Sequence, residues 1–173
     1  MTISIRPLDP PDWEIYRTVR LRALQREPAV FSSNYAKEAA CGQDVWQGRL
    51  SGKAGRVFGV FDAENIIGLT GIFQDSEDVR GKTVMLVMSY LDKEYRGRGL
   101  SRLLYEARIK WAISQPQYER ITVSHREGNE SSRRANQSFG FAFTHKTMKA
   151  WPDGQDAEQW HYELLLKPLR EPK

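Results

Sequence analysis

The sequence predicts a single mixed α+β domain, in which a central and mostly antiparallel sheet of about seven strands packs against about four helices. Three observations predict this fold. The recognisable elements follow the order β-α-α-β-β-β-α-β-α-β-β along the chain. The length of 173 residues suits one domain with a substantial core. The hydrophobic fraction of 40% and the aromatic fraction of 11% are typical of a globular protein.

The first third of the chain predicts one strand and two helices. Residues 3–7 alternate between apolar and polar side chains and end at a proline, which indicates a short strand. Asp12 is a good N-cap residue, and apolar residues at helical spacing after it predict a helix to about Gln25. A second helix is expected over residues 38–50, with an interruption or restart near Gly42.

The middle of the chain predicts a hairpin, a further strand and a long helix. Residues 56–61 and 66–73 are apolar runs on either side of a polar turn, as in a hairpin. Residues 84–91 form another apolar run, and an amphipathic helix from Leu100 to Ser114 follows. One stripe of that helix is expected to face the core, namely Leu100, Leu103, Leu104, Ala107 and Trp111.

The last third predicts a strand, a short helix and a terminal hairpin. The strand spans residues 121–125, and Asn129 then caps a helix that ends near Ser138. The hairpin pairs residues 141–151 with residues 159–166. We therefore expect one domain that reaches residue 167, followed by a polar and frayed tail over the remaining residues 168–173.

Charge and hydropathy narrow the function classes. Lys and Arg number 26 and Asp and Glu number 22, which gives a net charge of +4, and the basic residues form no long block. Nucleic-acid binding is therefore not expected, although a pI of about 9.2 keeps it as a third alternative. No signal segment and no membrane-spanning apolar run is present, so we expect a cytoplasmic protein without membrane association.

Cysteine and histidine usage argues against a metal site. Cys41 is the only cysteine, so no intrachain disulfide and no cysteine-based zinc site can form. The three histidines, His125, His145 and His161, are widely spaced and show no metal-ligand pattern. We expect no metal cofactor.

A basic glycine turn lies between strand 84–91 and the long helix. It reads Tyr95-Arg96-Gly97-Arg98-Gly99-Leu100-Ser101-Arg102. A helix N-terminus presents unpaired backbone N–H groups that suit a phosphate, and the two glycines keep side chains away from such a group. The three arginines add positive charge. The spacing lacks the third glycine of a dinucleotide site and the lysine of a P-loop, so an anion site and a plain turn stay equally open at this point.

This order of elements, with the glycine turn after the fourth strand, resembles the GNAT superfamily of acyl-CoA-dependent N-acyltransferases. Arg96, Gly99 and, imperfectly, Ser101 match the family signature Q/R-x-x-G-x-G/A. A second block, from Asn129 to Phe141, is similar to the family's N-x-x-A…Y-x-x-x-G-F stretch. The resemblance covers nearly the whole chain.

The resemblance implies a GNAT-like fold, in which the strands at 84–91 and 121–125 form a splayed parallel pair, and acetyl-CoA as co-substrate. Backbone N–H groups of the glycine turn would hold the CoA diphosphate, and the end of strand 84–91 would pair with the pantetheine arm. The N–H of Leu91 would donate to the thioester oxygen. The residues that the resemblance assigns to acetyl-CoA are Tyr90, Leu91, Arg96, Gly97, Arg98, Gly99, Leu100, Ser101, Asn129, Ser132 and Asn136.

Two residues are weak catalytic candidates. Where the family often has a tyrosine as general acid, this chain has Asn136, whose amide can donate a hydrogen bond to sulfur but cannot protonate a thiolate at a useful rate. His125 stands on strand 121–125, where the family usually has an aliphatic residue. An imidazole there suits a general base, or it is a core histidine that bonds to the backbone.

The resemblance therefore implies an N-acetyltransferase that transfers an acetyl group directly from acetyl-CoA to a primary amine of a small molecule or peptide. A non-catalytic acyl-CoA-binding or sensor module is the alternative, which Asn136 keeps open. A homodimer is compatible with the sequence. Residues expected beside the acceptor are Phe31, Ser32, Asn34, Tyr35 and Trp151.

Overall fold

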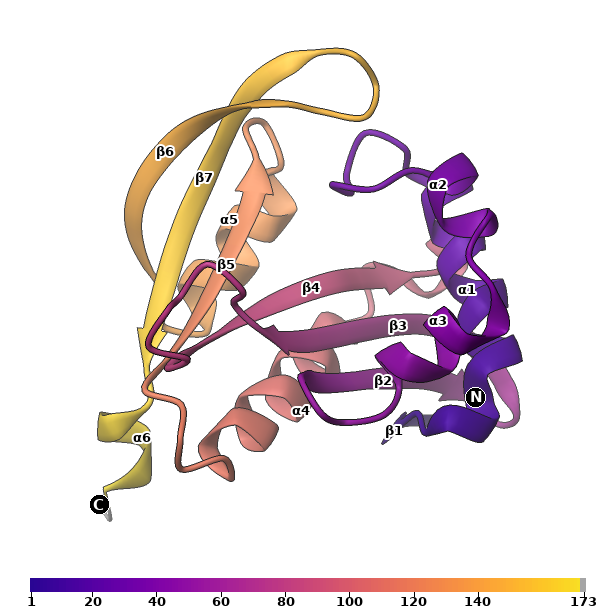
Figure 1. Ribbon diagram of the computed structural model, residues 1–173, viewed down its shortest axis with the longest axis horizontal. Coiled ribbons are helices and arrows are strands. Elements are labelled where there is room, and N and C mark those ends of the chain that lie inside the picture. The colour runs from indigo at the N-terminus through magenta and orange to yellow at the C-terminus, as the bar shows by residue number, and fades with distance from the viewer. Residues whose placement is uncertain (172–173) are drawn as a thin grey trace.

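A sheet of seven strands forms the centre of the computed structural model, which describes residues 1–171 (Figure 1). The strands are β1 (Ile3–Pro7), β2 (Gly55–Asp62), β3 (Asn65–Gln74), β4 (Thr83–Leu91), β5 (Arg120–Arg126), β6 (Ala142–Ala150) and β7 (Asp156–Leu165). They lie in the order β1-β2-β3-β4-β5-β7-β6, and every neighbouring pair is antiparallel except β4 and β5. The predicted mixed sheet with one parallel pair is confirmed.

Six α-helices and two short 3₁₀ helices complete residues 1–171. They are η1 (Pro10–Asp12), α1 (Trp13–Arg26), α2 (Tyr35–Ala39), α3 (Gln43–Arg49), η2 (Lys93–Tyr95), α4 (Ser101–Ile113), α5 (Glu130–Ser138) and α6 (Lys167–Arg170). The helix expected over residues 38–50 is divided in two at Gly42, which is the N-cap of α3 and has an extended backbone. Within the described part of the chain, no helix combines the length and apolarity that crossing a bilayer requires.

The segment predicted as a frayed tail instead contains α6. Its last residue, Arg170, reaches back to the C-terminal end of α4 and donates to the carbonyl oxygens of Ala112, Ile113, Gln115 and Tyr118. A cation at this end complements the helix macrodipole and satisfies carbonyl groups that have no helical partner. Residues 172–173 of the predicted tail lie outside the described residues.

Helices cover both faces of the middle of the sheet. Along β2, Val57 belongs to the same buried cluster as Tyr16 of α1 and Trp46 of α3. The next residue, Phe58, belongs to the cluster that contains Tyr105 of α4. Because helices lie on both faces, residues 57–61 of the strand are all apolar and buried, without alternation.

The buried face of α4 differs from the predicted stripe. Of the five residues expected to face the core, only Leu104 is fully buried, and the other four are half-buried. The fully buried residues of the helix are Leu104, Tyr105, Arg108 and Ala112. Relative to the predicted stripe, the buried face is rotated toward the end of α5, where the Tyr105 ring stacks on the ring of Phe139 with their centroids 4.5 Å apart. The rotation carries an arginine into the core.

The parallel pair is short and then diverges. β4 and β5 are paired from Thr83 opposite Arg120 only as far as Met85 opposite Thr122. Beyond this point β4 runs toward α1 while β5 runs toward β6 and β7 (Figure 1). On this edge of β4, residues 86–91 therefore have no strand beside them.

A β-bulge lies in the divergent part of β4. Leu69 and Gly71 of β3 pair with Tyr90 and Val87, so β4 has one residue more than β3 at this point. Met88 adopts a positive φ of 57°, which is uncommon for a residue other than glycine. Bulges of this kind re-aim side chains and often lie beside functional sites.

Candidate active site

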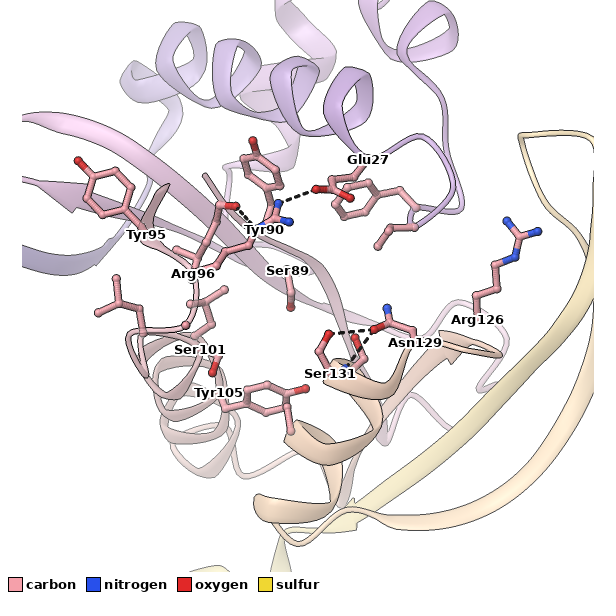
Figure 2. A pocket seen from close by; sticks show the side chains of 18 of the residues that line it. Glu27, Ser89, Tyr90, Tyr95, Arg96, Ser101, Tyr105, Arg126, Asn129 and Ser131 are labelled. Carbon is pink, nitrogen blue, oxygen red and sulfur yellow. Dashed lines mark hydrogen bonds and ion pairs between the residues drawn. The ribbon is translucent and has the colours of Figure 1, made fainter. Parts of the chain in front are cut away.

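A cleft of about 640 Å³ opens where β4 and β5 diverge. The second half of β4, the glycine turn, the start of α5 and the loop after α1 form its walls (Figure 2). The residues predicted to bind acetyl-CoA that line it are Tyr90, Leu91, Arg96, Gly97, Gly99, Leu100, Ser101, Asn129 and Ser132. Arg98, His125 and Asn136 are not part of its lining.

The glycine turn presents a row of free donors to the cleft. The backbone N–H groups of residues 97–101 have no hydrogen-bond acceptor among residues 1–171. Gly97 and Gly99 have φ angles of +73° and +76°, which favour glycine, and a Cβ at either position would meet no atom within 4 Å. The row stands at the N-terminus of α4, where the macrodipole is positive. Backbone geometry and charge therefore both suit a phosphate group.

The arginines of the turn are held by neighbours. Arg96 lies 2.7 Å from a carboxylate oxygen of Glu27 and donates to the carbonyl of Leu91. Arg98 lies over the ring of Tyr95, and Arg102 pairs with a glutamate one turn further along α4. The net charge that Arg96 adds to the phosphate region is thus reduced by its pairing.

Tyr90 can contribute to the cleft only through its main chain. Its phenol donates to Asp92 at 2.8 Å, and Asp92 is also paired with Arg22 and Arg26 at 2.9 Å. Burial and the hydrogen bond to Asp92 raise the pKa of the Tyr90 phenol, which stays neutral. This network fixes the end of β4 against α1.

The start of α5 forms the wall opposite the glycine turn. The Asn129 side chain accepts from the backbone N–H of Ser132 and from the hydroxyl of Ser131, as an N-cap does. A second hollow, of about 550 Å³, extends from Gly99 and Ser101 between α4 and α5. Together the two hollows give an elongated site that passes the N-termini of both helices.

Asn136 lies beneath the cleft. It is fully buried, and its Oδ1 accepts from the phenol of Tyr105 at 2.6 Å. Its Nδ2 has no partner among the described residues. Tyr105 lines the cleft, and burial raises the pKa of its phenol while the charge of Arg108 opposes this rise. Asn136 stands where the family often has a tyrosine that acts as the general acid. In this chain the residue instead holds the phenol of Tyr105, which comes from α4.

Both ring nitrogens of His125 are engaged. Nδ1 lies 2.7 Å from the carbonyl oxygen of Arg126, which can only accept, so Nδ1 carries the hydrogen. In the neutral ring Nε2 then accepts from the hydroxyl of Tyr162 at 3.0 Å. This is the geometry of a core histidine that bonds to the backbone, and it leaves no nitrogen directed at the cleft.

The end of the cleft away from the glycine turn has both an acidic and a basic side chain. Phe31, Glu127 and Arg126 line it, and Arg126 is paired with Asp153 at 2.6 Å. Three other residues predicted for this region, Ser32, Asn34 and Tyr35, do not line the cleft. Trp151 is buried beside it, with Arg126 over its ring.

Sequence reasoning missed two residues of α4. Tyr105 lines the cleft, and Arg108 lies behind it and donates to the hydroxyl of Ser89 at 2.9 Å. The spacing of Tyr105, Arg108 and Ala112 is that of a helical face, but an arginine in such a stripe is rarely read as buried. Only the rotation of α4 reveals it.

Known proteins share this fold. An acetyltransferase of the GNAT family from Streptococcus pneumoniae has 18% sequence identity and a TM-score of 0.78, over 95% of this chain and 99% of that chain. A putative acetyltransferase from Salmonella typhimurium, solved with its cofactor acetyl-CoA, has 18% identity and a TM-score of 0.80, over 100% and 99%. Spermidine N-acetyltransferase from Vibrio cholerae, in complex with CoA and spermine, has 14% identity and a TM-score of 0.76, over 95% and 96%. No curated protein matches the chain.

At these identities the solved structures establish the fold alone. The family itself is established by a sequence model, which matches residues 13–141 and so spans the helices α1–α5 and the whole cleft. The chain therefore belongs to the acetyltransferase (GNAT) family.

Proposed function

We propose that this protein transfers the acetyl group of acetyl-CoA directly to a primary amine of a small molecule or peptide. One observation carries the proposal. Gly97, Gly99, Leu100 and Ser101 line the cleft between the diverging strands β4 and β5, and their backbone N–H groups have no acceptor among residues 1–171. Acetyl-CoA in the Salmonella typhimurium protein and CoA in the Vibrio cholerae protein, both of the same fold, support a ligand of this class.

The residues present fit acetyl-CoA. The N–H row at 97–101 would hold the diphosphate, with the positive end of α4 behind it. The free edge of β4 at Tyr90 and Leu91 offers main-chain groups to the pantetheine arm, and Asn129 and Ser132 close the opposite wall. When bound, acetyl-CoA supplies a thioester carbonyl that a neutral amine can attack.

The acceptor amine must lose a proton before or during attack. Among the described residues of the cleft, Glu27 and Glu127 carry carboxylates. Glu27 is held by Arg96, whereas Glu127 uses Oε1 to accept the backbone N–H of Glu158, and its Oε2 has no partner within residues 1–171. We assign proton acceptance, directly or through one water, to Glu127 in preference to His125.

A thiol-release assay tests the proposal. The protein is incubated with acetyl-CoA and a panel of primary amines that includes polyamines, amino acids and short peptides, and free CoA is measured. Release that depends on one amine, with an acetylated product of that amine by mass spectrometry, is expected. Glu127→Gln should lower turnover mainly at the acidic side of the pH profile, and Glu130→Gln, on the exposed side of α5, serves as the matched control.

The alternative is an acyl-CoA-binding module without turnover. Asn136 favours it, because the phenol of Tyr105 is committed to this amide and no general acid replaces the family tyrosine directly. Micromolar binding of acetyl-CoA by calorimetry, with no product from any amine, would select the alternative. Absence of binding would contradict both functions.

A further inference from the structure

Arg108 is a buried cation behind the cleft. Its side chain is 1% exposed, its Nε donates to the carbonyl of Leu104 and its Nη1 donates to the hydroxyl of Ser89, both at 2.9 Å. Its Nη2 is buried without a partner, and its guanidinium lies 4.9 Å from the ring centre of Tyr105. The group is thus held in a fixed position but is not neutralised.

The other cations of the cleft are neutralised. Arg96 is paired with Glu27 and Arg126 with Asp153, whereas no carboxylate within residues 1–171 forms an ion pair with Arg108. Burial lowers the pKa of Arg108 to about 10, so the guanidinium still carries its charge at neutral pH. Burying an ion without a counter-ion costs free energy. The unpaired guanidinium of Arg108 therefore indicates that an anion completes the site.

Ser89 connects this charge to the cleft. It is exposed on the β4 bulge, and its side chain points into the space between Tyr105 of α4 and the start of α5 (Figure 2). Because Arg108 has no acceptor atom, the Ser89 oxygen must accept from it. The buried hydroxyl of Thr70 lies 3.3 Å away and can donate to the same oxygen. With Thr70 as the donor of this pair, the hydrogen of Ser89 is free to point into the cleft.

Neither Tyr105 nor Asn136 offers an equivalent hydrogen. The phenol of Tyr105 donates its hydrogen to Asn136, and the free amide hydrogens of Asn136 lie beneath the cleft lining. We propose that Ser89, polarised by Arg108, donates the hydrogen bond that stabilises the thiolate of CoA as it leaves. The inference rests on the proposed function and names the residues that replace the missing tyrosine.

The step balances without a proton from the protein. The amine nitrogen forms a bond to the thioester carbon, the bond from carbon to sulfur breaks, and its electron pair stays on sulfur. The proton lost by the amine goes to the base or to water. Ser89 keeps its proton and donates a hydrogen bond to the thiolate, while Arg108 acts on Ser89 as a positioning residue.

The bound CoA thiol provides a test that needs no acceptor. CoA is titrated with pH in the presence of excess protein, and the ultraviolet absorbance of the thiolate gives the thiol pKa. CoA titrated in the same buffer without protein gives the reference pKa. We expect the thiol pKa to fall by about one unit or more when CoA is bound to the native protein, which raises the ratio of thiolate to thiol about tenfold at any given pH. Ser89→Ala and Arg108→Met should abolish most of this fall.

Controls separate the inference from the proposed function. Lys110→Met removes an exposed cation from the same helix and should leave the bound thiol as in the native protein. Acetyl-CoA has no thiol, so calorimetry with it reports whether each variant is folded and binds. If Arg108→Met does not fold, Ser89→Ala still tests the inference, because this substitution lies at the exposed bulge. Two results would overturn the inference but leave the proposed function standing. One is a bound CoA thiol with the same pKa as free CoA, and the other is a fall in this pKa that is as large in Ser89→Ala as in the native protein. Failure of the native protein to bind CoA overturns the proposed function with it.

Discussion

Replacement of Gly99 by glutamate is the sharpest test of the phosphate site. A Cβ at Gly99 meets no atom within 4 Å, so the side chain enters open space in front of the N–H row. The φ angle of +76° imposes a strain of roughly 1–2 kcal/mol on any residue other than glycine. Native domains are typically stable by about 5–15 kcal/mol, so the variant should fold.

The loss of affinity follows from the added charge. Two unit charges about 4 Å apart repel by about 4 kcal/mol at an effective dielectric constant of about 20. Salt and water at this open site reduce the repulsion, and we take about half, or about 2 kcal/mol. Since about 1.4 kcal/mol corresponds to a factor of ten, CoA should bind about 30-fold more weakly. Competition of the carboxylate for the N–H groups acts in the same direction.

Isothermal calorimetry with CoA measures this change, and two variants control for strain. Gly99→Ala has the same backbone strain without the charge and should keep most of the affinity. Gly154→Glu places the same carboxylate at a φ of +81° in open space, in the turn between β6 and β7. It should bind CoA like the native protein. Equal affinity of Gly99→Glu and Gly154→Glu would show that residues 97–101 do not hold a phosphate.

Three further variants test how the fold supports the site. Asn129→Ala should lower the free energy of unfolding by about 1 kcal/mol through loss of the α5 N-cap, whereas Asn129→Ser should retain it, and equal losses in urea denaturation would contradict the capping role. Burial alone would raise the pKa of Glu38, but its ion pair with Arg20 outweighs burial and lowers it. This contribution is complete above the ordinary value of 4.5 and is lost as pH falls through the lower folded value. Below pH 4.5 the free energy of unfolding should therefore fall more steeply with decreasing pH in the native protein than in Glu38→Gln. The same pH dependence in both proteins would refute this. Arg170→Ala should lower the free energy of unfolding by about 2 kcal/mol, and the melting temperature with it, through loss of its hydrogen bonds to the carbonyls of Ala112 and Ile113 in α4. Lys167→Ala should not, and an equal fall in Lys167→Ala would contradict the role given to Arg170.

Local chemistry explains what could be predicted. The seven strands, the N-cap at Asn129 and the turn at residues 97–101 all depend on residues close together in the sequence. Alternation, capping and positive φ angles are properties of short segments, so the pattern of residue types suffices to find them. The divergence of β4 and β5 was available only through the family resemblance, because no local pattern states where two strands stop pairing.

The sequence by itself therefore determined the order of elements, the donor row of the glycine turn and the family. Only the tertiary structure decided that Arg108 is buried behind Ser89, that Tyr105 is held by Asn136 and that His125 bonds to Tyr162. Each of these contacts joins segments that are 19 to 37 residues apart. The periodicity of α4 predicts that one face is buried, but which face depends on the shapes of β4 and α5 against which the helix packs. The chemistry of the cleft is set by that rotation.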